Sequence, residues 1–143
     1  MDVGCTIIMD LDRFAEYTLR KGLNQYKPNI ITGTLTHLVE EFIEKFHAVH
    51  IFGLDEERGT EEVILELPYV DEELLEKIRL ELERIRRVIE KLGGSITIAV
   101  STGPVTCKPV GKRREAYMDF NRKKASKILR RAKRRGGNRV IIF

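Results

Sequence analysis

The spacing of apolar residues is the feature that most constrains the fold of this chain. Apolar side chains recur every three or four positions over residues 29–46 and again over 71–92, which predicts two long helices with one apolar face each. Asp71 is the expected N-cap of the second helix, and Gly93-Gly94 is its expected end. A shorter apolar stripe over residues 125–132 predicts a further helix. Each of these helices needs a second layer against which to bury its apolar face.

Short segments rich in apolar and β-branched residues predict that second layer. They indicate strands over residues 3–10, 48–54, 61–67, 95–101 and 139–143. A turn containing Gly59 joins the second and third strands into a hairpin, and the polar stretch 11–27 is expected to hold a short helix and a loop. The first six elements, β-α-β-β-α-β, follow the ferredoxin-like pattern. We therefore expect one α+β domain over residues 1–143, with both long helices on one face of the sheet and an added C-terminal αβ unit.

Length and composition exclude several classes of protein. The chain has 143 residues, 42% hydrophobic and 34% charged, a balance that buries a core. It has no apolar run of the roughly 18 residues that a membrane span needs, and Met1 to Val3 do not begin like a signal peptide. Two cysteines, Cys5 and Cys107, are too few and too far apart for a zinc site or a disulfide framework. We expect a cytoplasmic protein.

Positive charge is concentrated at one end of the sequence. Residues 108–143 contain 14 Lys or Arg against two acidic residues, a net charge of +12, whereas residues 1–107 contain 12 basic and 20 acidic residues, a net charge of −8. A basic segment beside an acidic body is typical of a protein with a phosphate-bearing partner, nucleic acid included. A solvated helix with many surface charges has the same composition. Charge alone leaves both interpretations open.

Acidic residues stand where the first predicted strand ends. Asp10 and Asp12 follow the apolar run directly, and a carboxylate buried at the end of a central strand needs a partner. Magnesium is usually held by one or two carboxylates together with substrate phosphates. The alternative interpretation is that these aspartates only cap a turn.

A second acidic pair opens the returning strand of the predicted hairpin. Glu61 and Glu62 follow Gly59 closely, and in a ferredoxin-like sheet the first strand and this strand are central neighbours. We therefore expect the carboxylates of Asp10 and Glu61 to approach each other, an arrangement that needs a cation and occurs in metal-assisted phosphoryl transfer. The alternative is an acidic hairpin tip that serves solubility.

Four segments of the chain match the motifs of one family in order. Residues 10–14 are similar to D-[IL]-D-x-F, residues 59–63 to G-G-[DE]-E-F, residues 95–105 to an ITVSIGVA strand, and residues 124–140 to R-A-D-x-A-x-Y-x-A-K-x-x-G-x-N-x-V. These motifs belong to GGDEF-type nucleotidyl cyclase domains, which have a palm-like fold. The resemblance covers most of the chain. In size and layout the sequence is similar to the single-domain minimal CRISPR polymerases of that superfamily.

The resemblance implies catalytic and metal-binding roles. Mg²⁺, or Mn²⁺ in its place, would be bound by the carboxylates of Asp10 and Glu61 and the carbonyl of Leu11, and Asp12 would ligate or orient it. Glu62 would lie beside the attacking 3′-hydroxyl or a second metal ion. Lys133 would reach the phosphates from the last helix, whereas Arg130, Arg131, Arg134 and Arg135 are expected to be solvated.

The resemblance also implies a nucleotide-binding set, with departures from the family. The set comprises Arg13, Phe14 and Ala15, whose backbone would hold the β- and γ-phosphates, and Gly59, Thr60 and Lys124. Thr60 replaces a glycine, and its side chain is expected to crowd the nucleotide. Thr18-Leu19 stands where diguanylate cyclases have an Asn-Asp pair that helps to read guanine, so GTP is not favoured over other NTPs. Gly137 stands in place of an arginine that contacts a phosphate.

The leading hypothesis is a Mg²⁺-dependent nucleotidyl cyclase or short-oligonucleotide synthase that uses NTPs. Each palm holds one NTP, so a cyclic dinucleotide product implies a homodimer. Three alternatives remain open at this point: a GTP cyclohydrolase of the same fold, a degenerate member that binds a nucleotide without turnover, and a small RNA-binding module. Phe52 is the one aromatic residue in the central strand candidates, which disfavours base stacking on the sheet.

Overall fold

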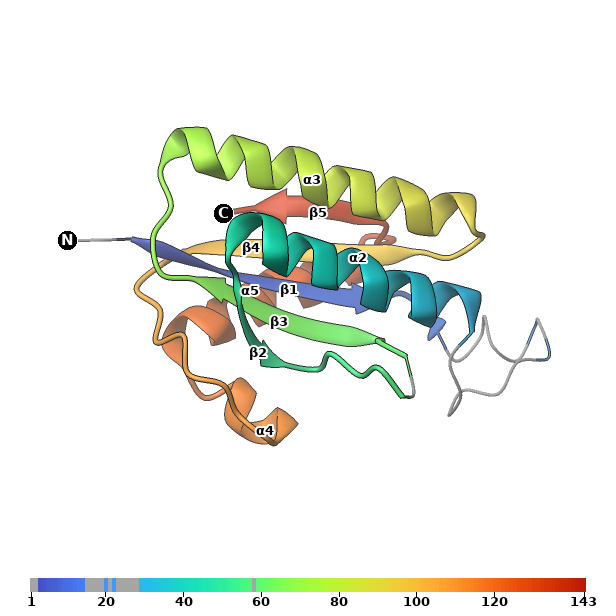
Figure 1. The fold of residues 1–143 in the computed structure, drawn as a ribbon, viewed down its shortest axis with the longest axis horizontal. Helices are drawn as coiled ribbons and strands as arrows, with labels where there is room; N and C mark the ends of the chain where they lie inside the picture. Colours follow the sequence, from blue (N-terminus) through green and yellow to red (C-terminus); the bar gives the residue numbers. More distant parts are fainter. Residues whose placement is uncertain (1–2, 15–19, 21, 23–28, 58) are drawn as a thin grey trace.

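The chain folds in the predicted order, with one additional short helix (Figure 1). The computed structural model describes residues 3–14, 20, 22, 29–57 and 59–143, so most of the predicted helix and loop over residues 11–27 lies outside the described residues. The strands are β1 (Gly4–Leu11), β2 (Val49–Phe52), β3 (Glu62–Leu67), β4 (Ile96–Gly103) and β5 (Arg139–Ile142). The helices are α2 (Ile30–Phe46), α3 (Glu72–Lys91), α4 (Arg113–Ala116) and α5 (Phe120–Arg134).

The strands form one sheet in the order β2-β3-β1-β4-β5. The central strand β1 is antiparallel to β3 and β4, and β5 is parallel to β4. The first four strands therefore have the ferredoxin-like arrangement, and the predicted α+β fold with an added αβ unit is confirmed. Because β1 is covered on both faces, a charged side chain at its end has few routes to water.

Helices cover both faces of the sheet (Figure 1). Helices α2 and α3 pack on one face, over a core that includes Ile7 of β1 and Leu65 of β3. Helix α5 lies on the other face, where Ile8 and Ile64 belong to a second apolar cluster. The two long helices share one face, as predicted. Since side chains alternate along a strand, the even-numbered residues of β1 face α5.

A buried ion pair fixes the first turn of α5 against the sheet. The Arg122 guanidinium donates to the Glu66 carboxylate of β3, with Nη2 and Oε1 2.9 Å apart and both side chains almost fully buried. The side-chain amide of Asn121 donates to Thr6 Oγ1 and to the Ser101 carbonyl, both at 2.9 Å. These contacts set the position of α5 along the sheet, and therefore where its last turn lies.

Two elements differ from the sequence-based expectation. The short helix α4 has no counterpart among the predicted elements, because four residues are too few to show a helical periodicity. Its last residue, Ala116, is buried in the apolar cluster on the α5 face. Strand β2 is shorter than the predicted 48–54 and has a bulge between His50 and Phe52. It ends at Phe52, and at the next residue, Gly53, a Cβ atom would lie 2.1 Å from the Glu62 carbonyl oxygen. In the described part of the chain, no helix is long and apolar enough to cross a membrane.

Candidate active site

The register of the sheet brings Asp10 together with Glu62. Asp10 pairs directly with Glu62 of β3 on one side and with Thr97 of β4 on the other. Directly paired residues of antiparallel strands point to the same face, and Asp10 faces α5. The residue directly opposite Asp10 is therefore Glu62, one position after the Glu61 that the sequence predicted. Glu61 precedes β3; its carbonyl accepts the Leu11 N–H at 3.0 Å, and its side chain is exposed.

Lys133 points from the last turn of α5 to the end of β1, as predicted. Its ammonium donates to the carbonyls of Leu11 at 3.2 Å and Asp10 at 3.4 Å, and lies 3.8 Å from Asp10 Oδ1. The four arginines expected to be solvated, Arg130, Arg131, Arg134 and Arg135, are all exposed. The Leu11 carbonyl, predicted as a metal ligand, therefore faces the same small region as Asp10 and Lys133.

The Asp12 carboxylate accepts hydrogen bonds from four protein donors. Oδ1 accepts from Thr97 Oγ1 at 2.7 Å and from Lys133 Nζ at 2.8 Å, and Oδ2 accepts from Ser95 Oγ at 2.7 Å and from the Asn138 N–H at 2.9 Å. Its side chain is 6% exposed. Protein donors thus occupy both oxygens of Asp12, which disfavours the first of its two predicted roles, metal ligation. Asp12 instead positions Lys133 and joins the ends of β1, β4 and β5.

Gly137 lies directly against this carboxylate. A Cβ atom at Gly137, which has φ of 66°, would come within 2.7 Å of Asp12 Oδ2. The glycine that replaces the arginine of the family motif therefore allows the chain to close over Asp12. The next residue, Asn138, donates its N–H to the same oxygen.

Asp10 carries an unfavourable negative charge. Burial raises the pKa of Asp10 to about 6; the Lys133 ammonium opposes this, and the carboxylates of Glu62 and Asp12 reinforce it. The side chain keeps 27% exposure. A half-buried carboxylate opposite a second carboxylate is an environment that a hard cation would stabilise.

The Glu62 carboxylate is held by the segment before α5. Arg113 donates to it through Nε, 3.2 Å from Oε1, and the Tyr117 hydroxyl donates to Oε1 at 2.8 Å. The bond to Glu62 raises the pKa of Arg113, and burial together with Glu62 raises the pKa of Tyr117. Since Arg113 is 68% exposed, its ion pair is readily exchanged for another cation. Sequence reasoning missed both residues, because neither belongs to a motif or a periodic pattern.

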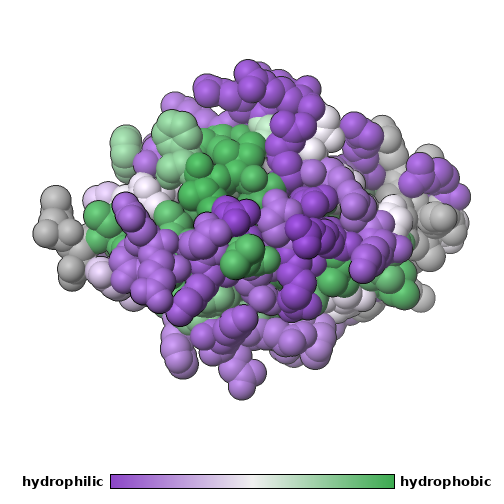
Figure 2. All heavy atoms as spheres, turned by 90° about the horizontal axis from the view of Figure 1, so that it is seen from above, coloured by the Kyte–Doolittle hydropathy of each residue, from purple (hydrophilic) through white to green (hydrophobic). Residues whose placement is uncertain are grey.

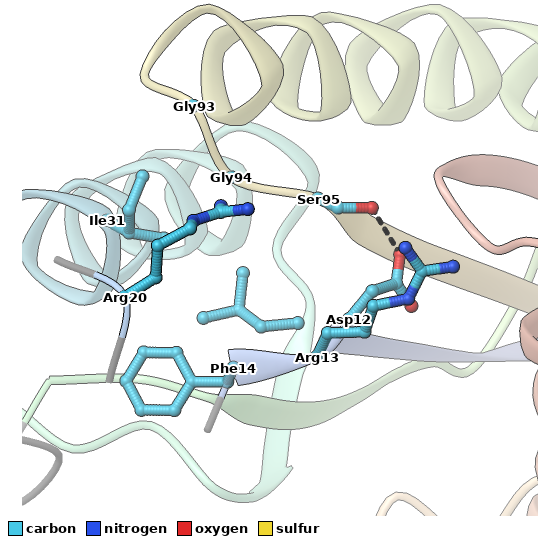
Figure 3. A pocket seen from close by; sticks show the side chains of 9 residues that line it. Asp12, Arg13, Phe14, Arg20, Ile31, Gly93, Gly94 and Ser95 are labelled. Atoms are coloured by element: carbon cyan, nitrogen blue, oxygen red, sulfur yellow. Dashed lines mark hydrogen bonds between the residues drawn. The ribbon is translucent and has the colours of Figure 1, made fainter. Parts of the chain in front are cut away.

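A small cavity of about 130 Å³ lies beside the end of β1 on the α2–α3 face. Arg13 and Phe14, two predicted nucleotide-binding residues, line it with Ile31 and Arg20 (Figure 3). Figure 3 shows the Asp12 carboxylate hydrogen-bonded to Ser95 at one side of the cavity. Arg13 adopts a left-handed backbone conformation with φ of 49°, which turns the chain at the end of β1. Ala15 lies outside the described residues.

The other predicted nucleotide-binding residues lie in three different places. Gly59, with φ of 85°, lines a larger cavity of about 580 Å³ with Glu61 and Glu62. Thr60 is fully buried and its Oγ1 lies 2.7 Å from that of Thr36, so the expectation that it crowds a nucleotide is wrong; it ties the hairpin to α2. Lys124 donates to the Thr102 carbonyl at 2.8 Å.

Lys124 and Asp10 lie near opposite ends of strand β4. Thr102 pairs with Cys5, whereas Asp10 pairs with Thr97. Five residues of strand separate the two positions, or about 17 Å. Lys124 therefore does not lie beside Asp10 and Lys133, and its contact with the nucleotide stays a prediction. The motif match placed it correctly on the last helix, but at the end of α5 opposite to Lys133.

Comparison with solved structures identifies the architecture. The active GGEEF domain of a diguanylate cyclase from Vibrio cholerae superposes with a TM-score of 0.62 at 20% identity, covering 99% of this chain and 83% of that one. The guanylate cyclase domain of RhGC from Catenaria anguillulae, solved with GTP, gives 0.56 at 14% identity, covering 90% and 72%. The chain has the nucleotidyl cyclase fold. No protein-family model matches the sequence, and no curated protein matches it. At these identities the likeness establishes the fold.

Within this cyclase fold, the donor set at the end of β1 fits magnesium. Among the described residues no three His, Cys, Asp or Glu side chains gather as a metal-binding group. Magnesium does not require such a group, since one or two carboxylates and substrate phosphates suffice. Asp10, Glu62 and the Leu11 carbonyl supply hard oxygen donors of this kind.

Proposed function

We propose that this protein is a Mg²⁺-dependent nucleotidyl cyclase that joins NTPs. The observation that carries the proposal is the direct pairing of Asp10 with Glu62 at the end of the central strands, with Lys133 beside them. The cyclase domains with the same fold support it, one of them solved with GTP and a second with ATPαS. Two acidic side chains and one lysine at one point are suited to a metal-bound triphosphate.

The residues of the candidate active site would divide into those that hold the metal ion and those that bind the triphosphate. Asp10 and Glu62 would hold Mg²⁺, with the Leu11 carbonyl as a further ligand. When bound, Mg²⁺ neutralises triphosphate charge and polarises a phosphoryl oxygen. Lys133, held in place by Asp12, would bind a phosphate oxygen, and the Arg13–Phe14 turn would contact the triphosphate. Arg113 would leave Glu62 when the cation binds.

Joining two nucleotides also sets a requirement on assembly. The 3′-hydroxyl of one nucleotide loses its proton to water, its oxygen forms a bond to the α-phosphorus of the other nucleotide, and the bond from that phosphorus to pyrophosphate breaks. One palm holds one NTP, so we propose that two copies of the chain face each other during this reaction. The guanylyl cyclase domain of RhoGC from Blastocladiella emersonii is described as a non-canonical dimer in one structure and as a monomer in another.

Product analysis tests the proposal and the choice of carboxylate. Each NTP is incubated with the protein and Mg²⁺ or Mn²⁺, and products are identified by mass spectrometry. We expect pyrophosphate and a dinucleotide from at least one NTP, and a loss of about 100-fold or more for Glu62→Gln. Glu61→Gln is the matched control, since Glu61 is exposed and one residue outside the register, and it should lose less than about 10-fold.

Two results would overturn this assignment. Full activity in Glu62→Gln would exclude Glu62 from the site, and a larger loss in Glu61→Gln would restore the pairing predicted from the sequence. Binding of an NTP with no product from any of the four would favour the degenerate alternative. Ring-opened GTP without pyrophosphate would favour a cyclohydrolase.

A further inference from the structure

The groove between α5 and β5 has a basic lining that, among the described residues, contains no acidic side chain. It has a volume of about 330 Å³ and is lined by five cations, Lys124, Lys127, Arg131, Arg135 and Arg139. Within the described residues, none of the five forms an ion pair with a carboxylate. We call this surface the α5–β5 groove.

Helix α3 shows what a merely solvated charged helix looks like in this protein. Four of its six cations pair with acids along the helix: Lys77 with Glu73, Arg79 with Glu76, Arg84 with Glu81, and Arg86 with Glu83 and Glu90. Such i,i+3 and i,i+4 pairs are typical of solvated helices rich in charge. The α5–β5 groove is lined by cations and, within the described residues, by no acidic side chain. The repulsion among these cations favours the binding of an anionic partner.

The floor of the α5–β5 groove is apolar. Ile128 of α5 and Ile141 of β5 are half-buried there, and Phe143 beside them is 69% exposed. Figure 2 shows the molecule from the side of α3 and β5, with a hydrophobic area bordered by hydrophilic side chains. An apolar floor with a basic rim is the chemistry that contacts base faces and phosphates at the same time.

We propose that the α5–β5 groove binds single-stranded nucleic acid, a function beyond the nucleotide chemistry proposed above. A duplex does not fit a groove of about 330 Å³, because its bases are covered and its diameter is about 20 Å, whereas an unpaired strand presents its bases to Phe143 and the isoleucines. A lipid surface is flat and would not enter a concave groove.

The groove and the candidate active site are separate. With 3.6 residues per turn, Lys133 lies on the side of α5 opposite to Lys124, Lys127 and Arg131. Lys133 faces Asp10, and the groove cations face β5 and solvent. Variants of one site should therefore leave the other intact.

Fluorescence anisotropy with labelled 12-nucleotide RNA and DNA strands tests the proposal. The variant Lys127→Glu/Arg131→Glu reverses two groove charges; Arg130→Glu/Arg134→Glu is the control, with the same change of net charge on exposed α5 residues outside the groove. We expect Kd to rise at least about 30-fold for the groove variant and less than about 3-fold for the control. For the groove variant, the magnitude of the negative slope of log K against log salt should be smaller by about 1.4. Two phosphate contacts are lost, and each contributes about 0.7 for single strands.

Phe143→Ala separates stacking from charge. It should weaken binding about 10-fold and leave the salt slope unchanged. Comparison of the Kd for the RNA strand with that for the DNA strand shows whether the groove recognises the 2′-hydroxyl. Asp10→Asn should keep oligonucleotide binding, and the groove variant should keep NTP turnover, so the two proposals fail independently.

Four results would overturn the proposal. Equal loss in the groove and control variants would indicate a diffuse basic surface, and absence of oligonucleotide binding by the wild type would remove the function. A change of oligomeric state in the groove variant, measured by light scattering, would make the groove a contact between copies. Binding to phosphatidylserine vesicles but not to oligonucleotides would make it a lipid site.

Discussion

Replacing Asp12 with alanine is expected to lower the free energy of unfolding at pH 7 by about 3 kcal/mol, the largest stability effect of any single change near the site. The substitution removes the carboxylate that accepts from four donors, namely the Lys133 ammonium, the hydroxyls of Ser95 and Thr97, and the Asn138 N–H. Ser95→Ala, which removes one donor, is the control and should cost about 1 kcal/mol. Urea denaturation monitored by circular dichroism measures both.

The difference in free energy of unfolding between wild type and Asp12→Ala should depend on pH, because the pKa of Asp12 is shifted. Burial alone would raise that pKa, but hydrogen bonds from Lys133, Thr97, Ser95 and the Asn138 N–H hold it below its usual range. A depressed pKa stabilises the fold above the unfolded value of about 3.9, and this stabilisation is lost as the pH falls through the folded value. The gap between wild type and Asp12→Ala should therefore narrow below about pH 4. A gap that stays constant from pH 7 to pH 3 would contradict the assignment.

Replacing Asp10 with asparagine is expected to raise the free energy of unfolding, whereas Asp12→Ala lowers it. The pKa of Asp10 is raised from 3.8 to about 6, so the folded protein binds more protons than the unfolded chain between these values and loses stability as the pH rises through them. Above pH 6 the ionised side chain opposes folding, and its removal should stabilise the metal-free protein by roughly 1–2 kcal/mol, given about 1.4 kcal/mol per pKa unit and its partial exposure.

Thermal melts in EDTA at pH 7.5 measure this gain, and melts with Mg²⁺ provide the functional contrast. Added Mg²⁺ should raise the melting temperature of the wild type and not that of Asp10→Asn. Glu56→Gln, on the exposed hairpin turn, is the control for removal of a carboxylate and should change neither melt. Destabilisation by Asp10→Asn in EDTA would show that Asp10 serves the fold and not a cation.

Much of the fold could be predicted because its signals are local. The helices over α2 and α3 follow from three- and four-residue spacing, and the N-cap at Asp71 accepts the Leu74 N–H as expected. The position of Lys133 could also be predicted, since it borders the apolar stripe of α5. Periodicity within one element determines these features, and contacts between elements change them little.

Features that depend on register or on distant contacts could not be predicted. A shift of one residue moves a side chain to the opposite face of a sheet, and the spacing of Glu61 and Glu62 does not specify which one pairs with Asp10. Asp12 has the pattern of a metal ligand in sequence, yet its donors come from β4, α5 and the turn before β5, which lie more than 80 residues away. Tyr117 reaches Glu62 across 55 residues and carries no sequence signal at all.

Calorimetric titration with NTP in the presence and absence of Mn²⁺ measures whether Asp10 and Glu62 hold a metal-bound nucleotide. A triphosphate brings about four negative charges to a site that already holds two carboxylates, so binding should require the cation. We predict heat from at least one NTP with Mn²⁺, no heat without it, and at least a 100-fold weaker affinity for Asp10→Asn. Equal affinity of Asp10→Asn and wild type, or binding that does not depend on metal, would contradict the account.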